Sequence, residues 1–420
     1  MTSYFKNKFP VNSPTACQSK WTWSTIWLNE AKSSSCHRVK SWNIDPDNFA
    51  NFHNLPEKIE DRQRMLQGQW PEEKRGCEYC KKIEDSGGYS DRLHNNNIPG
   101  LIPKELYKDK TATIVTPRII EIFAQNTCNL ACIYCNEDLS SKIEAENNRY
   151  GRFNERSEKV ALYREKVKTY KEKMYSDFLT WLEDNIQGLA RLHLLGGETF
   201  IQHDLLEKVF DIIERKPNKH LQLNIFSNFN APSKFFYRYM NQIKNFATSK
   251  NIGRFDLTCS VDCWGPEQEY VRSGLNLELL EEYFSYAAEQ DESWLWLNVN
   301  QTISSMTIKT MPQLIEKIKK YKINRHIGHY FQTVDGFPFQ HPQIFDYSLW
   351  EKDFEIILNL LKGNNYHADD TFNRMLGIKK MLEANCKQDD TKIAQLHAYL
   401  DELDRRRGTY WRSLFPHLIV

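Results

Sequence analysis

The stretch RIIEIFAQNTCNLACIYC, which runs from Arg118 to Cys135, places three cysteines directly behind an apolar segment. The segment is rich in isoleucine and phenylalanine, and this composition predicts a β-strand. The cysteines follow with the spacing Cys-x3-Cys-x2-Cys, at Cys128, Cys132 and Cys135. A group of thiols this dense indicates a disulfide, a zinc site or an iron–sulfur site, unless it is coincidental. The rest of the chain has to decide between these alternatives.

The chain from Pro117 onward alternates between strand and helix character. The predicted strands are 118–126, 191–200, 221–230, 254–262, 294–303 and 326–334, and the predicted helices are 167–186, 203–216, 233–246, 276–290, 311–322 and 348–362. In the first helix, apolar residues recur at three- and four-residue steps, which is the period of a helix with one buried face. Such alternation is typical of a parallel sheet with right-handed crossovers.

Six strand–helix units can form an open barrel, so we expect an α/β fold with a partial (β/α)6 barrel. Function in barrels of this kind lies at the carboxyl ends of the strands, which is where the three cysteines follow the first strand. We expect three parts: a cysteine-rich module with its linker (1–100), the barrel (101–345) and a C-terminal helical extension (346–420). The linker is the stretch DSGGYSDRLHNNNIPG (85–100), whose Gly, Ser and Asn residues favour irregular structure.

The composition is that of a soluble globular protein. Of 420 residues, 40% are hydrophobic and 26% are charged, and 56 basic residues balance 55 acidic ones. This balance provides no overall field for nucleic acid or an anionic membrane, so we expect neither as a partner. The N-terminal residues lack the apolar core of a signal peptide, and no stretch has the length of a membrane span, so we expect a cytoplasmic protein. Thiols stay reduced there, which favours metal binding or catalysis over disulfides.

Three thiolates on one loop can hold three irons of a [4Fe–4S] cluster, because such clusters are built on cysteine thiolates. The fourth iron would then stay open for another ligand. Zinc is less natural here, since a structural zinc site has four protein ligands and no nearby His or Cys completes a standard spacing.

The cysteine loop resembles the signature of the radical S-adenosylmethionine (radical SAM) family, with the aromatic Tyr134 just before the last cysteine. The resemblance extends from about Pro117 to Phe339. The run Gly196-Gly197-Glu198 closes the second predicted strand and matches the GGE motif of the family. The stretch SVDCWGPEQEYVRSG (260–274) resembles a segment of the SPASM/twitch branch that supplies an acid and an arginine near S-adenosylmethionine (SAM).

The resemblance implies that Cys128, Cys132 and Cys135 hold a [4Fe–4S] cluster whose open iron binds SAM. Reductive cleavage of SAM then gives methionine and a 5′-deoxyadenosyl radical, which abstracts hydrogen from a substrate. Implied contacts are Glu198 with the SAM ammonium group, Arg272 with its carboxylate and Asp262 with its ribose. The two glycines allow close approach of the backbone. The full implied set of SAM-binding residues is Tyr134, Gly196, Gly197, Glu198, Ser227, Asn228, Asp262 and Arg272.

A second group of cysteines lies near the N-terminus: Cys17, Cys36, Cys77 and Cys80. Four thiolates make a closed site, either for zinc or for a fully ligated cluster. The first two flank the predicted strand KWTWSTIWLN (20–29), an arrangement that resembles the cysteine–strand–turn–cysteine hairpin of a twitch or SPASM module. The resemblance implies an auxiliary [4Fe–4S] cluster, although the family module usually follows the barrel. Zinc stays open as an alternative, with His37 or His53 able to replace a cysteine.

The remaining cysteines are not expected to bind metal. We expect Cys259 to be a core residue, because it lies inside an apolar strand. Cys263 lies beside Asp262 and is a candidate for facing the pocket, whereas Cys386 lies in a charged helical context and is expected to be incidental. The lysine-rich stretch KVALYREKVKTYKEK (159–173) is interpreted as a solvated helix face, because glutamates intersperse its lysines.

The leading hypothesis is a radical SAM enzyme of the SPASM/twitch branch. Its substrate would be a peptide side chain, a small metabolite or a nucleoside, and its electrons would come from a donor such as flavodoxin or ferredoxin. The alternative hypothesis is a non-catalytic binding protein on the same barrel, stabilised by zinc or iron–sulfur. A zinc-bearing nucleic-acid-binding protein is disfavoured by the net charge of +1.

Overall fold

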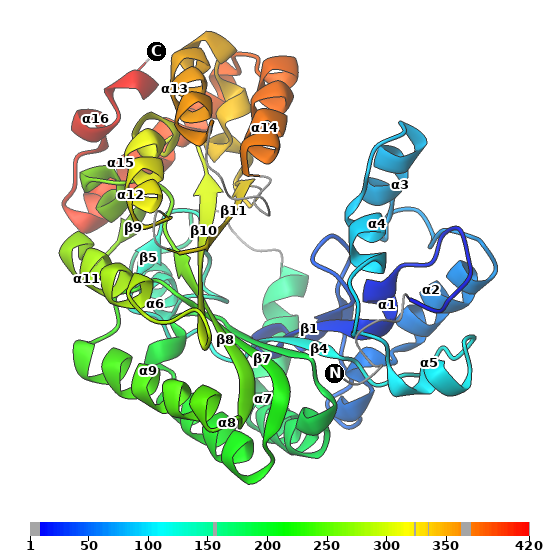
Figure 1. Cartoon of the computed structure of the whole chain (residues 1–420). Coiled ribbons are helices and arrows are strands. Elements are labelled where there is room, and N and C mark those ends of the chain that lie inside the picture. The colour runs from blue at the N-terminus through cyan, green and yellow to red at the C-terminus, as the bar shows by residue number, and fades with distance from the viewer. Residues whose placement is uncertain (1–8, 154–157, 323–324, 335, 363–370, 420) are drawn as a thin grey trace.

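The six strands predicted from Pro117 onward lie next to one another and run parallel in one nine-stranded sheet of the computed structural model (Figure 1). The structure describes residues 9–153, 158–322, 325–334, 336–362 and 371–419. All six predictions are confirmed, as β4 (Ile119–Phe123), β6 (Arg191–Leu195), β7 (Asn218–Ser227), β8 (Ile252–Ser260), β10 (Leu295–Ile303) and β11 (Ile327–Thr333). These strands lie side by side in sequence order, as successive strand–helix–strand units require.

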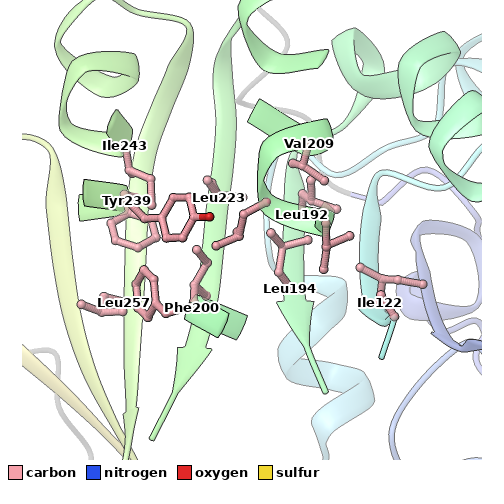
Figure 2. Packing of buried hydrophobic residues seen from close by; sticks show 14 of the residues in the cluster. Ile122, Leu192, Leu194, Phe200, Val209, Leu223, Tyr239, Ile243 and Leu257 are labelled. Carbon is pink, nitrogen blue, oxygen red and sulfur yellow. The ribbon is translucent and has the colours of Figure 1, made fainter. Parts of the chain in front are cut away.

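The helices between these strands pack on one face of the sheet. The predicted helices are confirmed as α7 (Glu158–Asn185), α8 (His203–Arg215), α9 (Ser233–Thr248), α11 (Leu277–Ala288), α12 (Met311–Lys322) and α13 (Glu351–Leu361). Figure 2 shows strand leucines such as Leu192 and Leu223 meeting Val209 of α8 and Tyr239 of α9. All four side chains are fully buried. Residues at alternate strand positions therefore face away from the helices, toward the opposite side of the sheet.

The N-terminal region joins the same sheet. The predicted strand within 20–29 is confirmed as β1 (Trp23–Trp27), which pairs in parallel with β4, so that Trp23 lies opposite Ile119. Antiparallel β2 (Lys32–Ser34) and β3 (Trp42–Asn43) extend the sheet to its edge. The sheet thus crosses the expected boundary near residue 100, and the division into 1–100, 101–345 and 346–420 stays a prediction. The helices of this region are α1 (Gln18–Thr22), α2 (Pro56–Leu66), α3 (Glu78–Asp85), α4 (Asp91–Asn96) and α5 (Lys104–Lys108).

The expected irregular linker at 85–100 is wrong, because α4 forms inside it. Ser90 caps the helix by accepting a hydrogen bond from the Leu93 amide at 3.3 Å. Arg92 then pairs with Glu84 of α3, and its Nη1 donates to the Ala16 carbonyl at 2.8 Å. A serine cap followed by an aspartate is a helix start. The glycines and asparagines around it concealed that signal.

The C-terminal residues form helices, as expected, within the described range 371–419. These are α14 (Thr371–Asn385), α15 (Asp390–Arg407) and α16 (Trp411–Leu414); residues 363–370, which belong to the expected extension 346–420, lie outside the described residues. They pack with α12 and α13 around a second hydrophobic cluster centred on Trp350 and Trp411. The remaining elements are β5 (Ala131–Cys132), α6 (Ser141–Tyr150), α10 (Pro266–Val271) and β9 (Arg272–Ser273).

The chain is thus α/β, with a mostly parallel sheet and many helices. The partial barrel and the twitch-like module stay predictions. Across the described ranges, no helix combines the length and the apolar character that a membrane crossing needs.

The core between sheet and helices should dominate stability. Leu223 on β7 is fully buried, whereas Leu162 on α7 is 65% exposed. We expect Leu223→Ala to lower the free energy of unfolding by about 2–5 kcal/mol, because it leaves a cavity in close-packed surroundings. The matched variant Leu162→Ala should change it by about 0.5 kcal/mol or less. Urea denaturation followed by circular dichroism measures both, and equal losses would contradict this assignment of the core.

Candidate functional site

The three cysteines of the loop after β4 line one cavity at the carboxyl ends of the parallel strands. We call it the cysteine cavity; it has a volume of about 260 Å³. Its floor is formed by the strand residues Phe123, Leu195, Phe226 and Ser260. Six of the eight residues expected to bind SAM also line it, namely Tyr134, Gly196, Gly197, Ser227, Asn228 and Arg272. The structure therefore brings together motifs that lie far apart in the sequence.

The thiols of the cysteine loop are close enough to act on one another electrostatically. Burial and, after it, the charge of Cys132 raise the pKa of Cys128 to about 12. Burial, followed by the charges of Cys132 and Cys128, also raises the pKa of Cys135. Mutual repulsion of this kind disfavours thiolates unless a cation compensates them. A metal that binds here must therefore displace protons from the thiols.

A short two-stranded sheet connects the cysteine loop to the 260–274 segment. Within it, Ala131 pairs with Ser273 and Cys132 with Arg272. This pairing places Nη1 of Arg272 3.9 Å from Sγ of Cys132. The Arg272 guanidinium is the strongest influence that lowers the pKa of Cys132, against the dominant effect of burial. The positive charge is thus built next to the thiols by the backbone itself.

Asp262 holds Arg272 in place from behind. Its two carboxylate oxygens accept hydrogen bonds from Nε and Nη2 of Arg272 at 2.8 and 3.0 Å. They also accept from the Tyr134 hydroxyl and, at 2.8 Å, from the Thr302 amide. Asp262 is fully buried and does not line the cavity, so its carboxylate is committed to the protein. This geometry fits a positioning role better than the expected contact with ribose.

The cysteine loop is also fastened by the C-terminal part of the chain. The Ile133 carbonyl accepts hydrogen bonds from the Tyr399 hydroxyl of α15 at 2.6 Å and from Nε2 of Gln340 at 2.9 Å. On the other side, Oγ of Ser140 donates to the Leu130 carbonyl at 2.7 Å. The C-terminal helices therefore take part in shaping the site, which the sequence did not reveal.

Gly196 and Gly197 let the loop after β6 pack against the cysteine loop. Both have positive φ, at 90° and 52°. A Cβ on Gly197 would lie 2.0 Å from the Thr127 carbonyl oxygen, and one on Gly196 would lie 2.7 Å from that of Gln125. Only glycine fits there. Close approach of the backbone was expected toward a ligand, but in this structure the backbone approached is that of the cysteine loop itself.

Glu198 ties the ends of β6 and β7 together. Its carboxylate accepts from the Asn228 amide at 2.6 Å, the Phe200 amide at 3.0 Å and the Ser227 hydroxyl at 2.9 Å. Burial raises the pKa of Glu198 to about 7, while these hydrogen bonds oppose the shift. The side chain is fully buried and does not line the cavity. It holds Ser227 and Asn228, which do, so the structure supports an indirect role in place of the expected contact with the SAM ammonium group.

The four N-terminal cysteines come together from three segments. Cys17 precedes α1, Cys36 follows β2, and Cys77 and Cys80 lie at the start of α3. Burial raises the pKa of Cys36 to about 12 and that of Cys77 to about 11, and charges on Cys17 contribute to both. The charge of Cys80 acts on Cys17 and Cys77. The fold therefore gathers these thiols, and Nζ of Lys20, paired with Asp61 at 2.6 Å, adds a positive charge beside Cys17 and Cys77.

The structure also places the other histidines and cysteines that the sequence singled out. Both ring nitrogens of His53 are engaged, by Oγ of Ser24 at 2.7 Å and by the Trp21 carbonyl at 3.0 Å, whereas His37 is exposed beside Cys36. Cys259 is a core residue, as predicted. Cys263 is fully buried and does not face the cavity, because Gln268 covers it, and Cys386 packs at the edge of the second hydrophobic cluster.

Among the described residues, no three or more His, Cys, Asp or Glu side chains converge tightly enough to form a ready-made site for a single metal ion.

Several residues that line the cysteine cavity were not predicted from the sequence. Phe123, Leu195, Phe226 and Ser260 lie on the strands themselves, just before the rim motifs. Three of them are the last residues of their strands, and Phe226 is the last but one of β7, so the ends of the predicted strands are the signal that could have found them.

Comparisons with known proteins leave the chain without a family. No protein-family model matches it, and no curated protein matches it in sequence. A similar solved structure is the crystal structure of SuiB from Streptococcus suis, with a TM-score of 0.37 and 14% identity, covering 82% of this chain and 69% of the SuiB chain.

The contact between the loops after β4 and β6 can be tested at Gly197. Gly151 provides a matched control, because its φ of 82° is also positive and a Cβ there would meet nothing within 4 Å. We expect Gly151→Ala to lower the free energy of unfolding by about 1 kcal/mol, the cost of the backbone conformation. Gly197→Ala should cost a further 1–3 kcal/mol, roughly, from the clash with Thr127. Equal losses in urea denaturation would show that the two loops do not depend on this contact.

Proposed function

We propose that this protein is a radical SAM enzyme of the SPASM/twitch type, in which Cys128, Cys132 and Cys135 hold a [4Fe–4S] cluster that binds SAM. One observation carries the proposal: three thiols from one loop share a cavity with the glycine backbone and the polar residues at the next strand ends. Strand ends of an α/β sheet are where ligands bind.

The donor set of the cysteine cavity fits the group. Its metal ligands are thiols, on which iron–sulfur clusters are built, and their number leaves one iron for another ligand. Arg272 supplies a fixed positive charge beside Cys132, at the place where a carboxylate of a bound molecule would be neutralised. Ser227 and Asn228 add hydrogen-bonding groups at the end of β7. No other set of described residues combines these features in one cavity.

Each residue of the site has a separate task in this proposal. Arg272 binds and orients the carboxylate of SAM, and Asp262 prevents the guanidinium from turning away. Glu198 fixes Ser227 and Asn228, so that their polar groups stay directed at the ligand. When bound, the cluster and SAM together supply a one-electron cleavage that yields methionine and a 5′-deoxyadenosyl radical able to remove hydrogen from a substrate. The apolar floor around Phe226 excludes water from that position.

We further propose that Cys17, Cys36, Cys77 and Cys80 hold a second [4Fe–4S] cluster, with zinc as the alternative. Four thiols make a closed set that leaves no iron open. A reducing protein such as flavodoxin or ferredoxin would supply the electron for the first cluster.

The proposed activity predicts SAM cleavage that depends on the cysteine loop. After anaerobic reconstitution with iron and sulfide and reduction with dithionite, the full chain should convert SAM to methionine and 5′-deoxyadenosine, measured by liquid chromatography and mass spectrometry. Cys132→Ala should abolish the conversion, because the cluster loses a ligand. Circular dichroism should show that the fold of the variant is kept.

The matched control is Cys386→Ala, which removes a thiol at the edge of the second hydrophobic cluster. It should cleave SAM like the unchanged protein. If the iron-loaded protein produces no 5′-deoxyadenosine above background, the proposed function is wrong.

The second cluster predicts a specific iron content. The anaerobic protein should hold about eight irons per chain, four for each cluster. A triple variant, Cys128→Ala/Cys132→Ala/Cys135→Ala, should keep about four of them, with the absorption of an iron–sulfur cluster. Metal analysis by mass spectrometry measures iron and zinc together. A triple variant that retains only zinc would overturn the auxiliary cluster and leave the SAM site standing.

A further inference from the structure

A second and larger cavity lies beside the cysteine cavity; Cys36 and His37 of the N-terminal cysteine group reach it, but none of the residues expected to bind SAM lines it. We call it the polar cavity; its volume is about 490 Å³. Side chains of β1, β4, β6, β7, β8, β10 and β11 line it, together with the segment around Cys36 and with Arg374 of α14. Phe226 of β7 lines both cavities. A volume of this size suits a small molecule or a short segment of one.

The register of the sheet shows how the two cavities are related. Glu121, His193, Asn224 and Asp256 lie opposite one another on four neighbouring strands. All four line the polar cavity. Two residues further along their strands, Phe123, Leu195 and Phe226 line the cysteine cavity. Residues two apart on a strand share a face, so both cavities lie on the face of the sheet away from the helices α8 and α9.

Within the described residues, two polar groups in the polar cavity make no hydrogen bond. Asn298 is only 8% exposed, yet across the described ranges its amide makes no hydrogen bond. The neighbouring Gly328 leaves room for it, since a Cβ there would lie 2.3 Å from Oδ1 of Asn298. Nδ1 of His193 is buried and also has no hydrogen bond; it lies 3.7 Å from Oε1 of Glu121. Buried polar atoms of this kind destabilise a protein unless something pairs with them, so the cavity is built for a polar ligand.

The charges in the polar cavity favour an anion. Each acid there already has partners: Asp256 is held by Nε of Arg254 at 2.6 Å, and Glu121 accepts from the Thr25 hydroxyl at 2.6 Å. Asp91 pairs with Arg38 at 3.2 Å. By contrast, in the described part of the chain no hydrogen bond or ion pair engages the guanidinium of Arg191, although the charge of Asp256, which is already held by Arg254, attracts it.

Arg374 is a second arginine that, among the residues the structure describes, forms no ion pair with a carboxylate. Its guanidinium lies 4.9 Å from the ring centre of Phe331, and its Nη1 makes a long hydrogen bond of 3.4 Å to the His329 carbonyl. The residue is exposed on α14 and marks the mouth of the cavity, whereas Arg191 is half-buried on β6. Two guanidinium groups, one inside and one at the entrance, can bind an anionic group by paired hydrogen bonds.

We infer that the polar cavity binds the substrate of the proposed reaction, and that this substrate is a hydrophilic small molecule or segment carrying a carboxylate or phosphate held by Arg191. The inference rests on the proposed function for its link to catalysis. The amides of Asn224, Asn298 and Asn300 provide further hydrogen bonds along the cavity wall. The anionic end lies against β6, and the part of the substrate that reacts extends toward Phe226, where the two cavities meet.

Small anions serve as probes, because they report the anion site without the complete substrate. The reconstituted full chain is titrated with inorganic pyrophosphate and, separately, with glutarate, by isothermal titration calorimetry at a fixed ionic strength of about 0.15 M. We expect saturable binding of at least one probe, and the tighter of the two shows whether the anionic group is a phosphate or a carboxylate. Arg191→Gln should weaken that binding by about tenfold to a hundredfold, because a charge-assisted pair of hydrogen bonds is lost.

Two further variants keep the test sharp. Arg374→Gln changes an exposed position, so the fold should stay intact while the affinity for the probe falls several-fold. The matched control is Arg238→Gln, which removes an arginine of α9 that pairs with Glu207 of α8. Both helices lie on the face of the sheet opposite the polar cavity, so this variant should leave the binding of the probe unchanged. Asn298→Leu should also weaken the probe while leaving the melting temperature equal or higher, since an unpaired buried amide is removed.

Absence of binding for both probes, or binding that is the same in Arg191→Gln, overturns the inference. These outcomes are distinct from failure of the proposed function, because calorimetry needs no SAM cleavage. If the protein cleaves SAM but Arg191→Gln leaves the binding of the probe unchanged, only the proposed anion site is wrong. If the probe binds through Arg191 but the protein does not cleave SAM, the proposed anion site stands and the proposed radical SAM activity is wrong.

Discussion

The arrangement of the site depends on the contact between the loops that follow β4 and β6. The backbone of Gly197 lies so close to the Thr127 carbonyl that no other residue fits, and the next amide, of Glu198, donates to that same carbonyl at 2.8 Å. Glu198 then carries the constraint to the end of β7 through two hydrogen bonds, from the Ser227 hydroxyl and the Asn228 amide. Burying that carboxylate raises its pKa to about 7, so the alignment of the strand ends is obtained at an electrostatic cost. Selection for a site, more than for stability, accounts for such an arrangement.

The two faces of the central sheet follow opposite physical rules. The face toward α8 and α9 is apolar and closely packed, and it supplies the hydrophobic stabilisation of the fold. The other face carries Glu121, His193, Asn224 and Asp256 at a single level across four strands. A parallel sheet in a purely structural role would be covered on both faces by apolar groups. The polar face is therefore functional surface, tolerated because the opposite face supplies the core.

The elements that the sequence predicts well are those with a strong local signal. The six strands and their helices have a clear periodicity of apolar residues, and the thiols of the cysteine loop are recognisable by their spacing. The sequence did not predict the polar cavity, because a polar strand residue that lines a cavity, such as His193 or Asn298, cannot be distinguished in sequence from one that faces solvent. Glu198 and Asp262 were assigned to a ligand on the basis of motif alone, whereas the structure shows that protein donors surround both carboxylates. Partners of that kind come from distant segments, and only the tertiary structure brings them together.

The pairing of β1 with β4 has a consequence for how the chain folds. Trp23 is made early in synthesis, but its parallel partner Ile119 is made only after the whole N-terminal cysteine region. The hairpin of β1 and β2 can form from local contacts, yet it presents an open strand edge until β4 is added. The gathering of Cys17, Cys36, Cys77 and Cys80 involves only this early segment. Metal loading at the N-terminal cysteines during synthesis would hold that segment compact, and so protect the edge of β1 from pairing with other chains before its own partner arrives.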